Sequence, residues 1–207
     1  MRQKDDKKVE HIFDATLQLV EQTGLAGITM CDISKAAGIA TGTLYIYFKN
    51  KEELINELFS VCRKESADLY FKHLEKEVDF KNAFRRIFMN IIQYRISNFR
   101  ESIFMDQCFH SPFVGEKKRK ESAKFMQPFF ELIEKGKEQR IIKDLDNLLL
   151  LWFLIGSINE VIKGTRYRKK NLTNEMIEGL FDMCWEGIRL DAGDRCKLIV
   201  SNHNKIY

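Results

Sequence analysis

The sequence has few chain breakers and no long apolar run. Only two of its 207 residues are proline, and because proline breaks helices and is common in turns, this scarcity favours long helices over a turn-rich β-architecture. The longest apolar run, residues 148–155, is eight residues long, whereas a helix needs ~20 apolar residues to cross a bilayer. The first residues also lack the apolar segment of a signal peptide. We therefore expect a cytoplasmic protein without a membrane partner.

The sequence also lacks the usual signatures of an enzyme or a metal site. The five cysteines are scattered without a C-x-x-C pair, and the four histidines have no ligand spacing, so reduced thiols are expected and no metal site. The motifs G-x-S-x-G, H-E-x-x-H and G-x-x-x-x-G-K-[ST] are absent. The sequence thus predicts no catalytic residue, no cofactor and no enzyme activity, while redox sensing by one cysteine stays open.

Charge does not mark the first quarter of the chain as a nucleic-acid binder. Hydrophobic residues make up 44% and charged residues 31%, as in a soluble globular protein, and the net charge is +4. Residues 1–60, however, hold nine acidic and seven basic side chains. Any DNA binding by this part must therefore use individually placed groups rather than bulk positive charge.

The first sixty residues show the start and stop signals of short helices. Apolar residues recur at helical spacing from Val9 and should stop at Gly24, where a left-handed cap is favoured. Thr29 and Asp32 predict a capping box for a second helix from residue 30 to Gly38. Thr41 is the expected N-cap of a third helix that runs through residue 48. Two helices joined by a short glycine-containing turn have the spacing of a helix-turn-helix.

The rest of the chain is predicted to be helical as well. Asn50 should cap a fourth helix that continues towards Leu74. Further helices are expected over about residues 80–98, 101–109, 118–139 with a kink at Pro128, 145–162 and 173–190. The predicted fold class is all-α with about nine helices: a three-helix helix-turn-helix domain over residues 1–53, a helical ligand-binding and dimerisation domain over 54–190, and a tail over 191–207.

Residues Thr29 to Leu54 resemble the DNA-binding signature of TetR/AcrR-type transcriptional regulators. The string Gly-Thr-Leu-Tyr-x-Tyr-Phe-x-x-Lys-x-x-Leu, from Gly42 to Leu54, carries the resemblance, which covers about Val9 to Leu58. The resemblance implies a homodimeric, ligand-responsive repressor that binds a palindromic operator in double-stranded DNA. It also implies a small hydrophobic effector that releases the repressor from DNA.

The third helix is the predicted reader of the operator. A short helix fits the major groove with its first turn towards the base edges, where threonine offers a hydroxyl and a methyl group and glycine permits close approach. Tyrosine hydroxyls and a lysine ammonium are suited to phosphate contacts. Position 41, often basic in related sequences, is threonine here, so few cations are available and the salt dependence should be modest. The predicted DNA contacts are Thr29, Thr41, Gly42, Thr43, Tyr45, Tyr47 and Lys51.

The C-terminal part is rich in phenylalanine, which suits a pocket for an apolar effector. The same residues at helical spacing also suit an ordinary hydrophobic core. The predicted pocket residues are Phe84, Phe88, Phe99, Phe104, Phe109, Phe129 and Trp152.

The last two helices are predicted to form the dimer interface. Residues 145–162 are apolar nearly all round, so they must be covered on two sides, by the chain and by a second copy. The alternative is that both helices simply fill the monomer core. The predicted interface residues are Leu151, Ile155, Ile158, Ile162, Ile177, Phe181, Cys184, Trp185 and Ile188.

Two other functions are compatible with the same sequence. A DNA-scaffolded protein-interaction factor could recruit an acidic partner through the basic residues 166–170. A carrier of apolar ligands could keep a DNA-binding head that no longer functions. One or a few palindromic sites beside a promoter would indicate the repressor, many dispersed sites the scaffold, and no sites the carrier.

Overall fold

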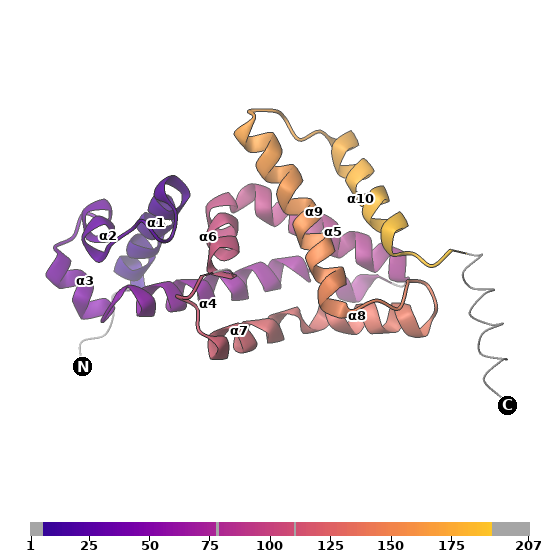
Figure 1. Cartoon of the computed structure of the whole chain (residues 1–207), viewed down its shortest axis with the longest axis horizontal. Coiled ribbons are helices and arrows are strands. Elements are labelled where there is room, and N and C mark those ends of the chain that lie inside the picture. Colours follow the sequence, from indigo (N-terminus) through magenta and orange to yellow (C-terminus); the bar gives the residue numbers. More distant parts are fainter. Residues whose placement is uncertain (1–5, 78, 110, 192–207) are drawn as a thin grey trace. The chain divides into compact units, whose positions relative to one another are not determined.

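The computed structural model describes residues 6–77, 79–109 and 111–191, in which helices are joined by short connecting segments (Figure 1). The described residues contain no strand beyond one isolated antiparallel bridge between Ile142 and Arg189. The all-α class is therefore confirmed. The α-helices are α1 (Asp6–Thr23), α2 (Met30–Ala36), α3 (Thr41–Tyr47), α4 (Lys51–Tyr70), α5 (Phe80–Ser97), α6 (Phe99–Phe109), α7 (Glu116–Ala123), α8 (Gln127–Glu138), α9 (Asn147–Tyr167) and α10 (Asn174–Ile188), with 3-10 helices η1 (Leu74–Lys76) and η2 (Lys124–Met126).

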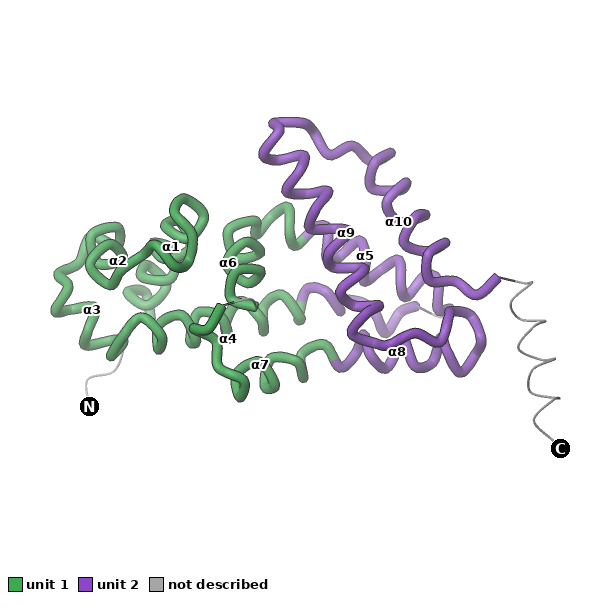
Figure 2. Tube along the Cα trace, viewed as in Figure 1, with its two compact units in different colours: residues 1–68, 94–126 green, residues 69–93, 127–207 purple. Residues whose placement is uncertain are grey.

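The chain divides into two compact units (Figure 2). The first unit comprises residues 1–68 and 94–126, and the second comprises residues 69–93 and 127–207. This division differs from the expected one, which placed a domain boundary after residue 53. The physical reason is that α1 packs on α6, so that the N-terminal helices share a core with a later segment. Of the tail predicted over 191–207, only Asp191 is described, and residues 192–207 lie outside the described part.

Local signals set the helix ends of the first unit. Gly24 and Gly38 have φ angles of +78° and +64°, a backbone region that glycine enters without steric cost. The predicted capping box between Thr29 and Asp32 is present. The expectation that Thr41 caps α3 is wrong, because Ala40 is the N-cap and makes no side-chain bond.

The helices after residue 50 follow the predicted order with two differences. The Asn50 side chain accepts from the amide of Glu53 at 2.8 Å, as expected for a cap, but α4 ends at Tyr70 rather than near Leu74. The single helix predicted over 118–139 is two helices, α7 and α8, joined by η2. Pro128 is the second residue of α8, where a missing amide hydrogen costs little. It therefore starts a helix instead of kinking one.

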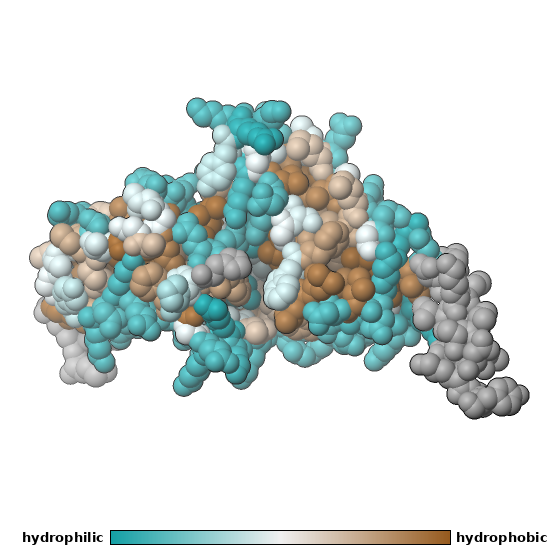
Figure 3. Space-filling view, viewed as in Figure 1, coloured by the Kyte–Doolittle hydropathy of each residue, from teal (hydrophilic) through white to brown (hydrophobic). Residues whose placement is uncertain are grey.

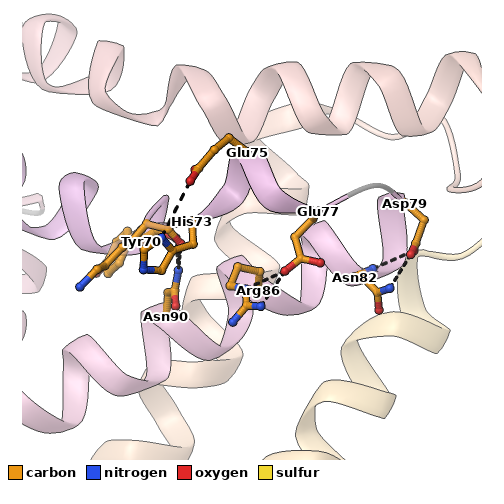
Figure 4. A network of polar contacts seen from close by, with 9 residues as sticks. Tyr70, His73, Glu75, Glu77, Asp79, Asn82, Arg86 and Asn90 are labelled. Carbon is orange, nitrogen blue, oxygen red and sulfur yellow. Dashed lines mark hydrogen bonds and ion pairs between the residues drawn. The ribbon is translucent and has the colours of Figure 1, made fainter.

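A polar network closes the connection between α4 and α5 in the second unit (Figure 4). The Asn90 side chain donates to the carbonyl oxygens of Tyr70 and Lys72, both at 3.0 Å, and so satisfies the C-terminal end of α4. Arg86 pairs with Glu77, with Nε to Oε1 at 2.8 Å. These bonds fix the turn that reverses the chain.

Aromatic side chains from α5 and α10 form the core of the second unit. Phe84 and Phe88 lie 6.3 Å and 5.3 Å, between ring centroids, from Phe181. Phe80 packs against Gly136 of α8 so closely that a Cβ at that glycine would lie 2.3 Å from the ring. At the edge, Arg85 donates to Glu178 at 2.6 Å.

Candidate nucleic-acid interface

The turn between α2 and α3 holds the two helices in a fixed relation. After α2, the amide of Ile39 donates to the Ser34 carbonyl at 3.0 Å while Gly38 takes the left-handed conformation. The hydroxyls of Ser34 and Thr41 are 2.8 Å apart and hydrogen-bonded. The first residue of α3 is thus tied to the middle of α2, as a rigid helix-turn-helix requires.

The inner face of α3 anchors it in the first unit. Leu44 and Phe48 are fully buried, as the sequence predicted for the core side of this helix. The ring of Phe48 lies 5.8 Å from that of Phe13 on α1. Because both ends of the inner face are held, the opposite face has a defined orientation towards solvent.

The outer face of α3 carries part of the predicted DNA contacts. Gly42 and Tyr45 are exposed, while Thr43 and Tyr47 are half-buried. A Cβ placed on Gly42 would meet no atom within 4 Å, so this position opens directly to solvent. Ile46 is 70% exposed and was missed by sequence reasoning. Its spacing of two residues from the buried Leu44 is a signal that would have found it, since two residues turn a helix by about 200°.

Two of the predicted hydroxyl contacts are already occupied. Thr29 Oγ1 donates to the Asp32 carboxylate at 2.6 Å and accepts from the Asp32 amide at 3.2 Å. The Thr29 hydroxyl and the Thr29 amide both donate to the Asp32 carboxylate and hold its pKa below its ordinary value, so a negative charge lies beside the hydroxyl offered to phosphate. The structure thus places Thr29 as a helix cap and Thr41 as the partner of Ser34.

Lys51 makes contacts within the chain that fit a structural clamp, while its phosphate contact stays a prediction. Its ammonium donates to the carbonyl oxygens of Leu25 and Ile28, both at 2.7 Å, and approaches that of Ala26 at 3.5 Å. The nitrogen also lies 4.5 Å from the ring centroid of Phe113. Burial lowers the pKa of Lys51. With these carbonyls as partners, the half-buried Lys51 side chain holds the loop between α1 and α2.

Residues from later in the chain hold the same loop. The amide of Leu25 donates to Gln107 Oε1 of α6 at 2.6 Å. Asn56 of α4 donates to the Phe113 carbonyl at 2.9 Å and keeps this aromatic residue beside Lys51. The loop that leads into α2 is thus fixed from α4, α6 and the segment after α6, all within the first unit.

Charged groups are absent from α3. No charged residue occurs in residues 36–48, so α3 presents hydroxyl, backbone and apolar groups only. The exposed lysines that flank this stretch are Lys35 on α2 and Lys49 before α4. Sequence reasoning did not select these two lysines, because an isolated lysine carries no spacing signal.

The predicted effector-pocket residues do not form one described cavity. Phe99, Phe104 and Phe109 belong to the first unit, and the other four to the second. Phe84 and Phe88 are core residues packed on α10, and Phe129 is fully buried beside Phe130. Trp152 is 65% exposed and faces solvent. A shallow depression of the second unit is instead lined by Gln127, Phe130, Glu131, Glu134, Lys135, Glu138 and Asn147.

The predicted dimer residues differ in how far they are exposed in the single chain. The chain's own core buries Ile158, Ile162, Phe181, Cys184, Trp185 and Ile188, so these side chains offer no surface to a second copy. Leu151, Ile155 and Ile177 are half-buried. The large hydrophobic side chains that α9 and α10 do expose are Leu148, Leu149, Trp152, Phe153, Tyr167, Met176 and Met183. Figure 3 shows the apolar surface over these two helices.

Within the described residues, α9 is the one helix long and apolar enough to cross a membrane by length and composition, and 28% of its most apolar window is buried. The apolar run at residues 148–155 is therefore only one part of a helix that is apolar over most of its length. Its inner face packs on α10, and it carries Asn159, Glu160 and Lys163 in its C-terminal half. A helix that is apolar on two sides is covered on both in a stable assembly.

The buried cysteines are unsuited to redox sensing. Burial raises the pKa of Cys108 to about 12 and raises that of Cys62 as well. Since the thiolate is the reactive form, both thiols are inert at neutral pH. Cys31 on α2 is exposed.

Two family models and several known regulators match this chain. Residues 12–58 match the family model described as bacterial regulatory proteins of the tetR family. Residues 49–190 match the tetracyclin repressor-like C-terminal domain. The chain is 28% identical over 117 residues to the HTH-type transcriptional regulator AcrR of Shigella flexneri, which is 56% of this chain and 54% of AcrR. The match therefore spans about half the length of that relative.

Solved structures share the fold over most of the chain. A TetR family transcription regulator from Marinobacter aquaeolei superposes with a TM-score of 0.83 at 24% identity, covering 92% of this chain and all of that one. The regulator FadR from Bacillus subtilis, solved in complex with stearoyl-CoA, superposes with a TM-score of 0.63 at 18% identity, covering 86% and 95%. The two family models together cover nearly all the described residues, and the chain belongs to the TetR family of helix-turn-helix transcriptional regulators.

Proposed function

We propose that this protein is a homodimeric repressor that binds a palindromic DNA operator and is released by a small hydrophobic effector. The observation that carries the proposal is the outer face of α3, which is open at Gly42 and bordered by exposed Tyr45 and half-buried Thr43 and Tyr47. A helix of this length enters the major groove with such side chains towards bases and phosphates. Thr29, Thr41 and Lys51 support this surface from behind, through the bonds described above.

Dimerisation is supported by the exposed apolar side chains of α9 and α10. Trp152 is 65% and Met183 71% exposed, and a patch of this kind usually marks an interface. A Cβ at Gly156 or Gly179 would meet nothing within 4 Å, which permits a second helix to approach closely. Four helices, α9 and α10 from each copy, would then bury these exposed apolar side chains.

A long acyl chain is the effector class with the most support. The FadR relative was solved with stearoyl-CoA, and the second unit of this chain has an aromatic core that could open around an apolar chain. Stearoyl-CoA should weaken operator binding by about 5–150-fold, the usual range of allosteric coupling. Coenzyme A without the acyl chain is the control. An unchanged operator affinity at saturating stearoyl-CoA would reject this effector class.

Gly42→Leu tests the DNA-binding surface without disturbing the fold. The substituted side chain points into open space and leucine favours the helix over glycine, so the melting temperature should not fall. Binding to an operator selected from genomic DNA fragments should weaken at least about tenfold, because the helix can no longer approach the bases. Gly115→Leu, at another open glycine of the same unit, is the matched control. Equal operator affinity of both variants and the wild type would refute the surface.

Trp152→Glu combined with Met183→Glu tests the dimer. Both side chains are largely exposed, so the fold of the single chain should survive while a charged pair disrupts the subunit contact. Sedimentation should shift from the dimer to the monomer, and operator affinity should fall with it. Leu69→Glu, at an exposed leucine of α4, is the control and should remain dimeric. A double variant that sediments with the wild type would exclude this interface.

A DNA-scaffolded interaction factor is the second candidate. Residues 161–174 contain five basic and no acidic side chains, and Arg168, Lys169 and Lys170 are exposed at the end of α9. Such a surface fits an acidic protein partner. Selection of genomic fragments followed by footprinting separates the candidates: a few palindromes beside promoters support the repressor, and many dispersed sites support the scaffold.

A further inference from the structure

The outward ridge of α3 is formed by Ile46 together with Gly42 and Thr43. Leu44 is fully buried and Ile46 is 70% exposed, and their separation of two residues puts them on opposite sides of the helix. Gly42 lies one turn before Ile46 on the same face and has no side chain to hide it. Ile46 is therefore the most exposed large apolar side chain of α3.

The chemistry of α3 restricts what it can read. The side chains that identify guanine, adenine or cytosine by hydrogen bonds are arginine, lysine, asparagine, glutamine, aspartate and glutamate. None of these occurs in residues 36–48. The outward ridge thus offers one hydroxyl group, that of Thr43, which can bond to more than one kind of base, and the methyl groups of Thr43 and Ile46. In the major groove, the base feature that an apolar side chain recognises is the 5-methyl group of thymine.

We infer that Ile46 is a specificity-determining residue that packs against a thymine 5-methyl group in each operator half-site. The inference rests on the proposed function, because it needs α3 to enter the major groove. A thymine contact gives a reason for the exposure of a large apolar side chain in the middle of α3, where it would otherwise face only water. It also predicts that operators of this protein carry thymine at the position opposite the middle of α3.

Removing a single methyl group from the DNA tests the contact. An operator is first selected with the wild-type protein, and each thymine is then replaced in turn by deoxyuridine, symmetrically in both half-sites. Deoxyuridine keeps the hydrogen-bonding edge of thymine and lacks the 5-methyl group. For the contacted thymine, wild-type affinity should fall about fourfold per half-site, the factor expected for exposing one methyl group to water.

The protein side of the cycle uses Ile46→Ala. This variant should bind the thymine operator more weakly than the wild type and should be insensitive to the same deoxyuridine substitution. Tyr45→Phe, which keeps an aromatic ring on the neighbouring exposed position, is the control and should retain the full deoxyuridine effect. Circular dichroism melting of each variant establishes that its fold is intact, which the exposure of both side chains leads us to expect.

The outcomes separate this inference from the proposed function. A selected operator at which deoxyuridine affects wild type and Ile46→Ala equally at every position overturns the role of Ile46 and leaves the repressor proposal standing. The same holds for an operator without thymine in the protected half-site. A selection that enriches no DNA sequence overturns both.

Discussion

Replacing Lys51 by methionine separates a clamp from a phosphate contact. Methionine keeps the length and packing of the lysine stem but has no ammonium, so the carbonyl oxygens of Leu25 and Ile28 lose donors at 2.7 Å. A hydrogen bond from a charged donor contributes ~1.5–3 kcal/mol net. For two bonds in a half-buried site we expect unfolding to become easier by about 2–3 kcal/mol, measured by denaturant titration.

The salt dependence of operator binding is a second measurement that separates a clamp from a phosphate contact. Each phosphate contact of a basic side chain adds about 0.9 to the slope of log affinity against log salt concentration. Loss of such contacts in both subunits would lower the slope by about 1.8, whereas loss of a clamp leaves the slope unchanged while the affinity falls. We expect the unchanged slope, measured by anisotropy at a temperature where the variant is folded.

Lys49→Met is the matched control for this experiment. Lys49 is exposed and lies two residues earlier, so its substitution removes the same charge from the same region without touching the loop at residues 25–28. Lys49→Met should leave the free energy of unfolding unchanged, whether or not it changes the slope of log operator affinity against log salt concentration. A Lys51→Met protein of wild-type stability with a slope reduced by about 1.8 would refute the clamp.

Three further predictions follow from the packing and the titrating groups. Gly136→Ala should destabilise the protein by about 1–2 kcal/mol in thermal or denaturant unfolding, because its Cβ would lie 2.3 Å from the Phe80 ring. Gly164→Ala, at an open position, is the control and should stabilise the protein by up to ~1 kcal/mol. Equal effects of the two substitutions on the free energy of unfolding would contradict the close packing at Gly136. Because the pKa of Asp32 is lowered from 3.8 by its bonds to Thr29, its contribution to stability is complete above about pH 3.8 and is lost as the pH falls through the folded-state value. Asp32→Asn should flatten that part of the pH profile of unfolding, and a profile identical to the wild type would argue against the cap. In a Cys196→Ser background, a thiol reagent should modify the exposed Cys31 rapidly and the buried Cys62, Cys108 and Cys184 only on unfolding; rapid modification of a second thiol would contradict their burial.

The sequence predicted the helices best where a few neighbouring residues decide the structure. The capping box of Thr29 and Asp32, the left-handed Gly38 and the cap at Asn50 act over three or four residues, so a motif suffices to find them. The expected cap at Thr41 is wrong, because α3 already includes this residue and its hydroxyl bonds to Ser34 in the preceding helix. Local capping rules do not include such a partner.

The candidate site was predicted in part. The string from Gly42 to Tyr47 lies on an exposed helix as expected, but the exposure of Ile46 and the burial of Ile158 or Phe181 depend on which face of each helix meets its neighbours. An apolar pattern marks the faces that avoid water, and it does not tell whether the cover is the same chain or a second copy. For this reason the dimer residues predicted from the pattern were mostly core residues.

By itself, the sequence determined the all-helical class, the helix-turn-helix and the family signature, because caps, glycines and periodicity are short-range properties of the chain. Only the tertiary structure decided the roles of individual polar groups. Lys51 bonds to carbonyls 23 to 26 residues earlier, and Gln107 holds an amide 82 residues away. The phosphate role was predicted for Lys51 from its place in the motif, but only folding brings its ammonium within 2.7 Å of the Leu25 and Ile28 carbonyl oxygens, and a hydrogen bond from a charged donor stabilises the fold.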